Sequence, residues 1–141
     1  MSSEIAQRMA VADALHSAAI RLLRLVRAQD AQAGIGPAQL SALSVLVFGG
    51  AKTLGELAAI EQVRSPTMSR IVEGLVQRGL VQRVSAPADR RAVSLTATPQ
   101  GRKLLLAGKA RRVRALAARL EGITKEEMRT LQAAAQLMAR L

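Results

Sequence analysis

Two short helices joined by a tight turn, near the middle of the chain, are the feature that most constrains its fold. Residues 53–56, Thr-Leu-Gly-Glu, fit a capping box, in which the threonine and glutamate side chains satisfy unpaired N–H groups at a helix start. A short helix through Ile60 and a tight turn over 61–63 follow. Ser65-Pro66 then predicts a second helix, with serine as its cap and proline at its first position. This helix-turn-helix pattern is only moderately specific by itself, because unrelated helix pairs share it.

A hairpin with charge at its tip follows the second helix directly. Residues 80–86 predict a strand, 87–90 predict a turn, and 93–96 alternate apolar and polar side chains as a returning strand. The side chains expected on one side of the first strand are Leu80, Gln82 and Val84. A helix-turn-helix followed at once by a basic hairpin is a winged helix, which is a more specific pattern than either part alone.

Longer helices flank this motif on both sides. Apolar residues recur every seven positions from Ile5 to Val26, which predicts one long helix over about residues 4–30 with coiled-coil-like spacing. Residues 99–120 carry a second apolar stripe, and a capping box at 124–127 opens a last helix. The stripes of the first and last helices are too apolar to face water, so we expect them to form an interface between two copies of the chain.

The expected fold class is therefore mainly α with a small β-wing (α+β). We expect one domain over residues 1–141, in which 37–98 form the winged helix-turn-helix. Residues 1–33 and 99–141 supply the N- and C-terminal helices of a dimerisation region.

The charge of the chain lies almost entirely in its second half. The net charge is +11; residues 1–63 are neutral, 64–91 carry +4 and 102–120 carry +7. Such a surplus suggests a polyanionic partner, either nucleic acid or an anionic membrane. Phe48 is the only aromatic residue, which argues against the stacking used on single strands and against the aromatic anchors of a membrane-surface helix. Contact with a duplex backbone is the better interpretation.

Other functional classes lack the residues that they need. The chain has no cysteine and a single histidine, which excludes disulfides, thiolate metal sites and multi-histidine metal sites. No nucleophile–base pair, carboxylate dyad or phosphate-binding glycine loop is visible, so we expect no enzyme, no metal and no cofactor. Glu4 and Arg8 interrupt the N-terminal segment, and no apolar run is long enough to cross a bilayer. We therefore expect a cytoplasmic protein.

The sequence resembles the multiple-antibiotic-resistance-regulator (MarR) family over nearly its whole length. The specific segments are Ser65-Pro66-Thr67-Met68-Ser69-Arg70, Gly79-Leu80-Val81, Asp89 through Thr96, and Gly101. The resemblance implies a homodimer that places a recognition helix in the major groove and a wing in the adjacent minor groove. It also implies a repressor that is released by a small ligand, often aromatic. The cysteine-based sensors of the family are excluded, because this chain has no thiol.

The second helix of the motif is the expected recognition helix. The expected inner stripe of this helix is Met68, Ile71, Val72 and Leu75, so that a polar face that includes Glu73 points outward. Arginine can read guanine with two hydrogen bonds, and hydroxyls can serve phosphates or bases. The alternative is an ordinary solvated helix face. The expected DNA-binding residues here are Arg64, Ser65, Pro66, Thr67, Ser69, Arg70 and Gln77.

Further basic side chains extend the expected interface. A narrow minor groove attracts arginine, so Arg90 is expected to enter it. The family pattern suggests that Asp89 pairs with Arg91 and stiffens the turn, although the hairpin could also be only a charged surface loop. Arg102 and Lys103 follow the wing and are expected to contact phosphates. The basic residues from Arg111 onward are expected to be solvated or to lie between subunits.

An effector site is expected between the first, second and fifth helices, by resemblance to the family. His16 and Arg24 lie near that junction and could anchor an anionic or small aromatic ligand. A lone histidine in such a place is more often a structural residue held by hydrogen bonds.

The sequence thus predicts a DNA-binding transcriptional regulator, expected to be a ligand-responsive repressor that binds a pseudo-palindromic, inverted-repeat operator as a homodimer. The alternative is a winged-helix module for protein interaction, which would not need an outward Arg70 beside a basic wing.

Overall fold

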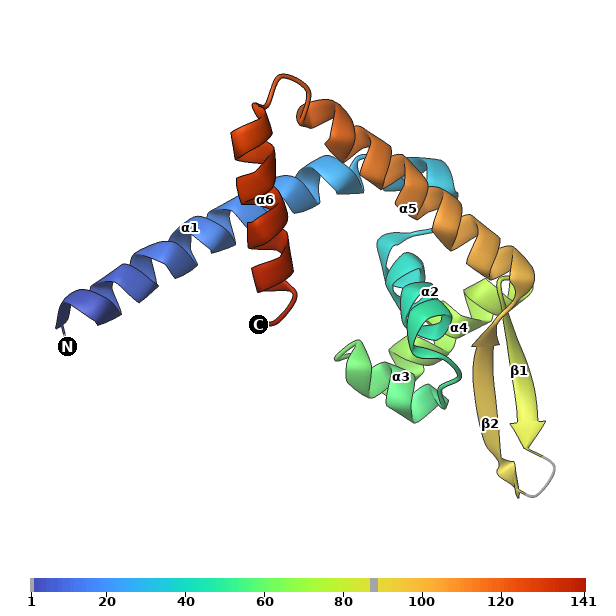
Figure 1. Cartoon of the computed structure of the whole chain (residues 1–141). Helices are drawn as coiled ribbons and strands as arrows, with labels where there is room; N and C mark the ends of the chain where they lie inside the picture. The colour runs from blue at the N-terminus through green and yellow to red at the C-terminus, as the bar shows by residue number, and fades with distance from the viewer. Residues whose placement is uncertain (1, 87–88) are drawn as a thin grey trace.

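The fold is mostly helical with one antiparallel hairpin, which confirms the expected class (Figure 1). The computed structural model describes residues 2–86 and 89–141, and the side chains of 3–85 and 93–141. Its elements are, in order, α1 (Ser2–Arg27), η1 (Asp30–Ala33), α2 (Pro37–Gly49), α3 (Leu54–Ile60), α4 (Ser65–Gln77), β1 (Val81–Ala86), β2 (Asp89–Ala97), α5 (Pro99–Arg119) and α6 (Lys125–Met138).

The hydrophobic core lies under the helix-turn-helix and the hairpin. Helix α2 packs against α4 and α5, α3 packs against α4, and the hairpin closes one side. Leu105 of α5 joins this core, so the first half of α5 is anchored to it. The largest fully buried side chains are Leu43, Leu57, Met68, Val72, Leu75, Val81 and Leu105.

Two of the three expected helix caps are confirmed. Thr53 accepts a hydrogen bond from the Glu56 N–H at 3.2 Å, and Thr124 accepts one from the Glu127 N–H at 3.2 Å. In turn, the carboxylate of each glutamate accepts a hydrogen bond from the backbone N–H of the threonine at the cap. The bonds from the backbone N–H and hydroxyl of Thr124 lower the pKa of Glu127, because they favour its ionised form.

The expected cap at Ser65 is wrong by one residue. Helix α4 begins at Ser65, and the residue at its cap position is Arg64, whose carbonyl accepts the first helical bond from Met68 at 3.0 Å. The Arg64 side chain makes no capping bond. Pro66 still sits in the first turn, where its missing N–H leaves no helical bond unmade. The proline therefore marks the helix start correctly, and the serine is part of the helix.

The wing begins one residue later than the sequence suggested. Gly79 adopts φ 71°, and the Leu80 N–H returns to the Leu75 carbonyl at 2.9 Å, which closes α4 in a Schellman motif. Strand β1 then starts at the buried Val81 and pairs with β2, with Arg83 opposite Leu95. The Val81 side of β1 therefore faces the core, while Val84 on the other side is 44% exposed.

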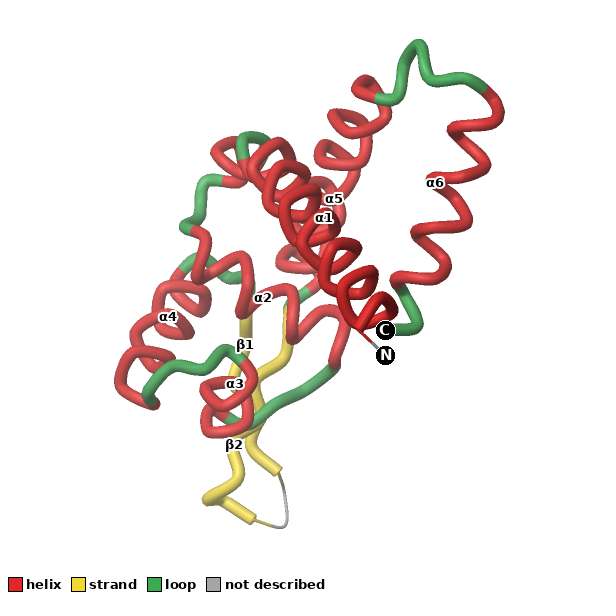
Figure 2. Tube along the Cα trace, turned by 90° about the vertical axis from the view of Figure 1, so that its left-hand side faces the viewer, coloured by secondary structure: helices red, strands yellow, loops and turns green. Residues whose placement is uncertain are grey.

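The first and last helices leave their apolar stripes uncovered. None of the described residues of α6 is buried, and Figure 2 shows α6 standing apart from the rest of the subunit beyond the turn that follows α5. Helix α1 contacts α5 near its C-terminal end, and its N-terminal half extends away from the core (Figure 1). The exposed apolar side chains of these two helices include Ile5, Met9, Val11, Leu15, Leu22, Leu131, Leu137 and Met138.

Among the described residues, no single helix has the length and apolar character needed to cross a membrane. Two helical segments, 3–33 and 37–49, meet those criteria only when taken together, and a bend of 93° separates them.

Gly101 is a position where this packing can be tested. It is buried in the first turn of α5, and a Cβ there would overlap the Leu80 carbonyl and lie 3.2 Å from Leu43 Cδ1. Because the carbonyl is backbone, it cannot swing aside. Gly101→Ala should therefore lower the free energy of unfolding by about 1–3 kcal/mol in urea titrations at fixed protein concentration.

Gly55 is the matched control for this experiment. It lies in α3, and a Cβ there would meet no atom within 4 Å. Gly55→Ala should leave stability unchanged or raise it by up to about 1 kcal/mol, through the better helix propensity of alanine. Equal stability of the two variants would contradict the close approach of α5 to Leu80.

Candidate nucleic-acid interface

Helix α4 presents the polar face that the sequence predicted. Met68, Val72 and Leu75 are each at most 1% exposed and fix the rotation of the helix about its axis. Among the described residues, Arg70 makes no ion pair, so its guanidinium is available to a ligand. The residues left exposed on the outer side include Arg64, Ser65, Pro66, Thr67, Ser69, Arg70 and Gln77.

Several contacts hold α4 against the rest of the motif. The turn before it places Gln62 in the left-handed region with φ 56°, and the Val63 N–H bonds the Ala58 carbonyl at 3.0 Å. At the other end, Arg78 Nη1 donates to the Gly34 carbonyl of the loop before α2. Helix α4 is therefore held at both ends, which fixes the direction of its outer face.

An ion pair joins α4 to the wing. Arg83 Nη2 of β1 lies 2.7 Å from Glu73 Oε2 on the outer side of α4. Sequence reasoning named Glu73 only as an outward residue and missed Arg83, because the strand was expected to start at Leu80. The alternation of β1 from the buried Val81 is the signal that could have found it.

The wing residues are described only in part. The backbone of Asp89, Arg90 and Arg91 forms the start of β2, and Asp89 is paired with Ala86. Their side chains lie outside what the structure describes, as do residues 87 and 88. The expected Asp89–Arg91 pair therefore stays a prediction, and so does an Arg90 that enters a groove.

Arg102 and Lys103 lie in the first turns of α5, directly after the wing, and both are exposed. Arg102 Nη2 also donates to the Val47 carbonyl at 3.4 Å, so it bridges α5 to the end of α2. The Thr98 hydroxyl donates to the Gly79 carbonyl at 2.6 Å, which ties the start of α5 to the end of α4. The backbone at the start of α5, which carries both basic residues, is thus held in place with respect to α4.

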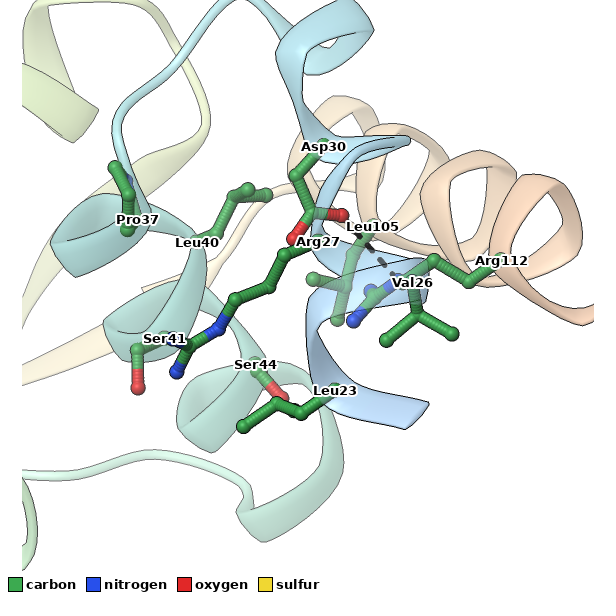
Figure 3. Close-up of a pocket in the computed structure, with 10 residues that line it drawn as sticks. All are labelled: Leu23, Val26, Arg27, Asp30, Pro37, Leu40, Ser41, Ser44, Leu105 and Arg112. Atoms are coloured by element: carbon green, nitrogen blue, oxygen red, sulfur yellow. Dashed lines mark ion pairs between the residues drawn. The ribbon is translucent and has the colours of Figure 1, made fainter. Parts of the chain in front are cut away.

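A cavity of about 400 Å³ lies between α1, α2 and α5, where an effector site was expected (Figure 3). Arg112 Nε and Asp30 Oδ1 form an ion pair across it at 3.4 Å. Neither His16 nor Arg24 is among its lining residues, and both lie exposed on α1. The residues that line the cavity are Leu23, Val26, Arg27, Asp30, Pro37, Leu40, Ser41, Ser44, Leu105 and Arg112.

A second, more open cavity of about 320 Å³ adjoins the first and shares Val26, Ser44 and Arg112 with it. Lys109 Nζ lies 5.7 Å from the centre of the Phe48 ring beside it. The junction therefore combines apolar walls with several cations. In the described part of the chain, no group of His, Asp or Glu side chains is arranged to hold a metal ion.

Known proteins share this arrangement. Residues 33–92 match the MarR family. An HTH-type transcriptional regulator of Mycobacterium tuberculosis is 37% identical over 93% of this chain and 92% of its own length. The HTH-type transcriptional repressor MdtR of Bacillus subtilis is 34% identical over 72% of this chain and 64% of its own length.

A solved structure agrees in fold over nearly the whole chain. A MarR family protein from Bacillus stearothermophilus superposes with a TM-score of 0.79 at 25% identity, covering 95% of this chain and 94% of that one. Its coverage includes the long outer helices as well as the winged helix-turn-helix. The relatives, the matched family and this shared fold together show that the chain belongs to the MarR family of helix-turn-helix transcriptional regulators.

Proposed function

We propose that the chain binds an inverted-repeat operator in double-stranded DNA as a homodimer and represses transcription until a small ligand releases it. The observation that carries this proposal is the outer face of α4, which is polar, exposed and next to a basic hairpin. The segment 64–91, which contains both elements, has a net charge of +4. The name of the relative MdtR supports the repressing role.

The proposed contacts follow from groove geometry. The major groove is about 12 Å wide and admits one helix, so α4 can lie in it with Arg70 facing base edges. The hairpin next to α4 can then reach the adjacent minor groove, where Arg90 is the proposed side chain. Arg102 and Lys103, close to the end of α4, are proposed to contact phosphates. Residues 37–98 thus form the DNA-binding part.

The proposed dimer is supported by the apolar side chains that a single subunit leaves exposed. None of the described residues of helix α6 is buried, and the apolar side chains of Leu131, Leu137 and Met138 are each more than two-fifths exposed. A second copy that covers these side chains and the stripe of α1 would remove a large apolar surface from water. Residues 1–33 and 99–141 are therefore the proposed dimerisation helices.

The proposed effector site is the junction between α1, α2 and α5. Arg27 and Arg112 can attract an anion, and Leu23, Val26 and Leu105 can cover an apolar or aromatic body. A ligand that favours a spacing of the two DNA-binding parts that does not fit DNA must lower DNA affinity, and DNA must lower ligand affinity equally.

A protein-interaction module is the second candidate. It would leave the outward Arg70 and the concentration of positive charge beside it without a role. Preferential binding to a palindromic duplex over a scrambled duplex in a gel-shift experiment separates the two functions, because the module would bind neither with preference.

Base reading can be separated from phosphate contact by two substitutions. Arg70→Ala should cost on the order of 1–3 kcal/mol and relax the preference at one position in each half-site. Arg102→Ala should weaken binding to all sequences and lower the salt slope by about one per lost contact. The measurement is a titration of both variants against a duplex library at several salt concentrations. A uniform loss for Arg70→Ala across all sequences would make Arg70 a phosphate contact.

The homodimer can be tested without DNA. Because the stripes of α1 and α6 are exposed in one subunit, the wild-type chain should sediment at twice its mass at micromolar concentration. Leu131→Glu, which places a charge on the exposed α6 stripe, should shift the equilibrium toward monomer. Arg129→Glu, a charge change on the same helix outside that stripe, is the control. A stable wild-type monomer would contradict the dimer.

The effector site can be tested with benzoate as a small aromatic anion. Benzoate should lower operator affinity, and Arg112→Ala should weaken benzoate binding measured by calorimetry, because it removes a cation from the cavity. His16→Ala should leave benzoate binding unchanged, since His16 is not among the lining residues. If His16→Ala weakened benzoate binding and Arg112→Ala did not, the ligand would bind near His16, as expected from the sequence, and not in this cavity.

A further inference from the structure

Arg83 lies between α4, the proposed recognition helix, and the hairpin that forms the wing. It follows the buried Val81 on the same side of β1 and stands opposite Leu95, which is 3% exposed. Its side chain therefore starts on the core side of the hairpin and leaves the core toward α4. Together with Ser69 of α4 it lines a cavity of about 200 Å³ between α3, α4 and the hairpin.

Glu73 holds Arg83 in this place. Among the described residues, the guanidinium of Arg83 makes one polar contact, the 2.7 Å bond from its Nη2 to Glu73 Oε2. Both side chains remain about half exposed, at 44% and 52%, so the pair lies at the surface. A guanidinium has five N–H donors in a rigid fork, and one bond to a carboxylate leaves the others free to serve a second acceptor.

The position of this pair has a consequence if the chain binds duplex DNA. A major groove and the adjacent minor groove are separated by one phosphodiester strand. A protein with a helix in one groove and a hairpin in the other must therefore face that strand with whatever lies between the two elements. In this chain the residues between them include Ser69 and Arg83.

We propose that Arg83 contacts a backbone phosphate between the two grooves and that Glu73 is its positioning residue. The inference rests on the proposed DNA-binding function and adds two residues to it. Glu73 keeps the long arginine side chain in one orientation before DNA arrives, so that less freedom is lost on binding. Because the partner is a phosphate, the contribution does not depend on base sequence.

The direction in which removal of Glu73 changes DNA affinity distinguishes positioning of Arg83 from simple repulsion of phosphates. A carboxylate close to phosphates lowers DNA affinity through its charge, so removing it should raise affinity if charge is all that matters. If Glu73 acts through Arg83, its removal should lower affinity instead. The same removal should raise affinity, or leave it unchanged, once Arg83 is already absent.

The first experiment measures anisotropy of a labelled mixed-sequence duplex and of a selected palindrome, at several salt concentrations. Arg83→Ala should lower affinity for both duplexes by the same factor, on the order of tenfold, and reduce the salt slope by about 0.9 for each lost contact. Arg83→Lys keeps the charge and should retain most of the slope. Arg119→Ala, which removes the same charge at the far end of α5, should leave the slope nearly unchanged.

The second experiment is a double-mutant cycle at physiological salt. Glu73→Ala should lower affinity several-fold in the wild-type chain and should not lower it in Arg83→Ala, whereas Glu73→Gln keeps an acceptor and should restore part of the loss. Circular dichroism checks that each variant remains folded, and sedimentation checks that its oligomeric state is unchanged.

Two results would overturn the inference while leaving the proposed function intact. One is an unchanged salt slope for Arg83→Ala, with Arg70→Ala still relaxing sequence preference. The other is a gain in affinity for Glu73→Ala that is equal in both backgrounds. A wild-type chain that binds neither duplex would overturn the DNA-binding function itself.

Discussion

Burial of one face of α4 is the interaction on which the rest of the interface depends. Met68, Val72 and Leu75 are almost fully enclosed, so any rotation of the helix would bring apolar side chains into water. The opposite face is thereby fixed, and Arg70 is held outward without a bond of its own to any described residue. Pre-organisation of this kind fixes the backbone of a binding surface before contact, so that only exposed side chains such as Arg70 remain to be ordered on binding.

The start of α5 connects this surface to the outer helices. Thr98 bonds the Gly79 carbonyl, and Gly101 lets the helix approach the Leu80 backbone. Farther along α5, Arg112 pairs with Asp30, and both residues line the cavity between α1, α2 and α5. A ligand that alters that pair would act on α5, the helix that directly follows the wing. Helix α5 is therefore a physical connection between the cavity and the proposed DNA-binding part.

The sequence predicted the features that short-range chemistry determines. The capping boxes at Thr53 and Thr124 each depend on a few neighbouring residues, and both were recognised. One error is local: the cap of α4 is Arg64 and not Ser65. Another involves tertiary context, because Arg83 gains its partner from a different element. The cavity residue Arg112 was likewise assigned to a solvated or intersubunit face, because its position opposite Asp30 depends on how η1 folds back.

In the proposed complex, two copies of the α4 face and the wing read one duplex symmetrically. Hydroxyl-radical footprinting on a duplex selected from a random library, together with methylation protection of guanines, tests this symmetry. We expect two equivalent protected regions related by a dyad, with centres about one helical turn or 10–10.5 base pairs apart. Major-groove protection should lie at the centre of each region and backbone protection beside it. A single asymmetric footprint, or protection without any dyad, would be incompatible with symmetric binding by a homodimer.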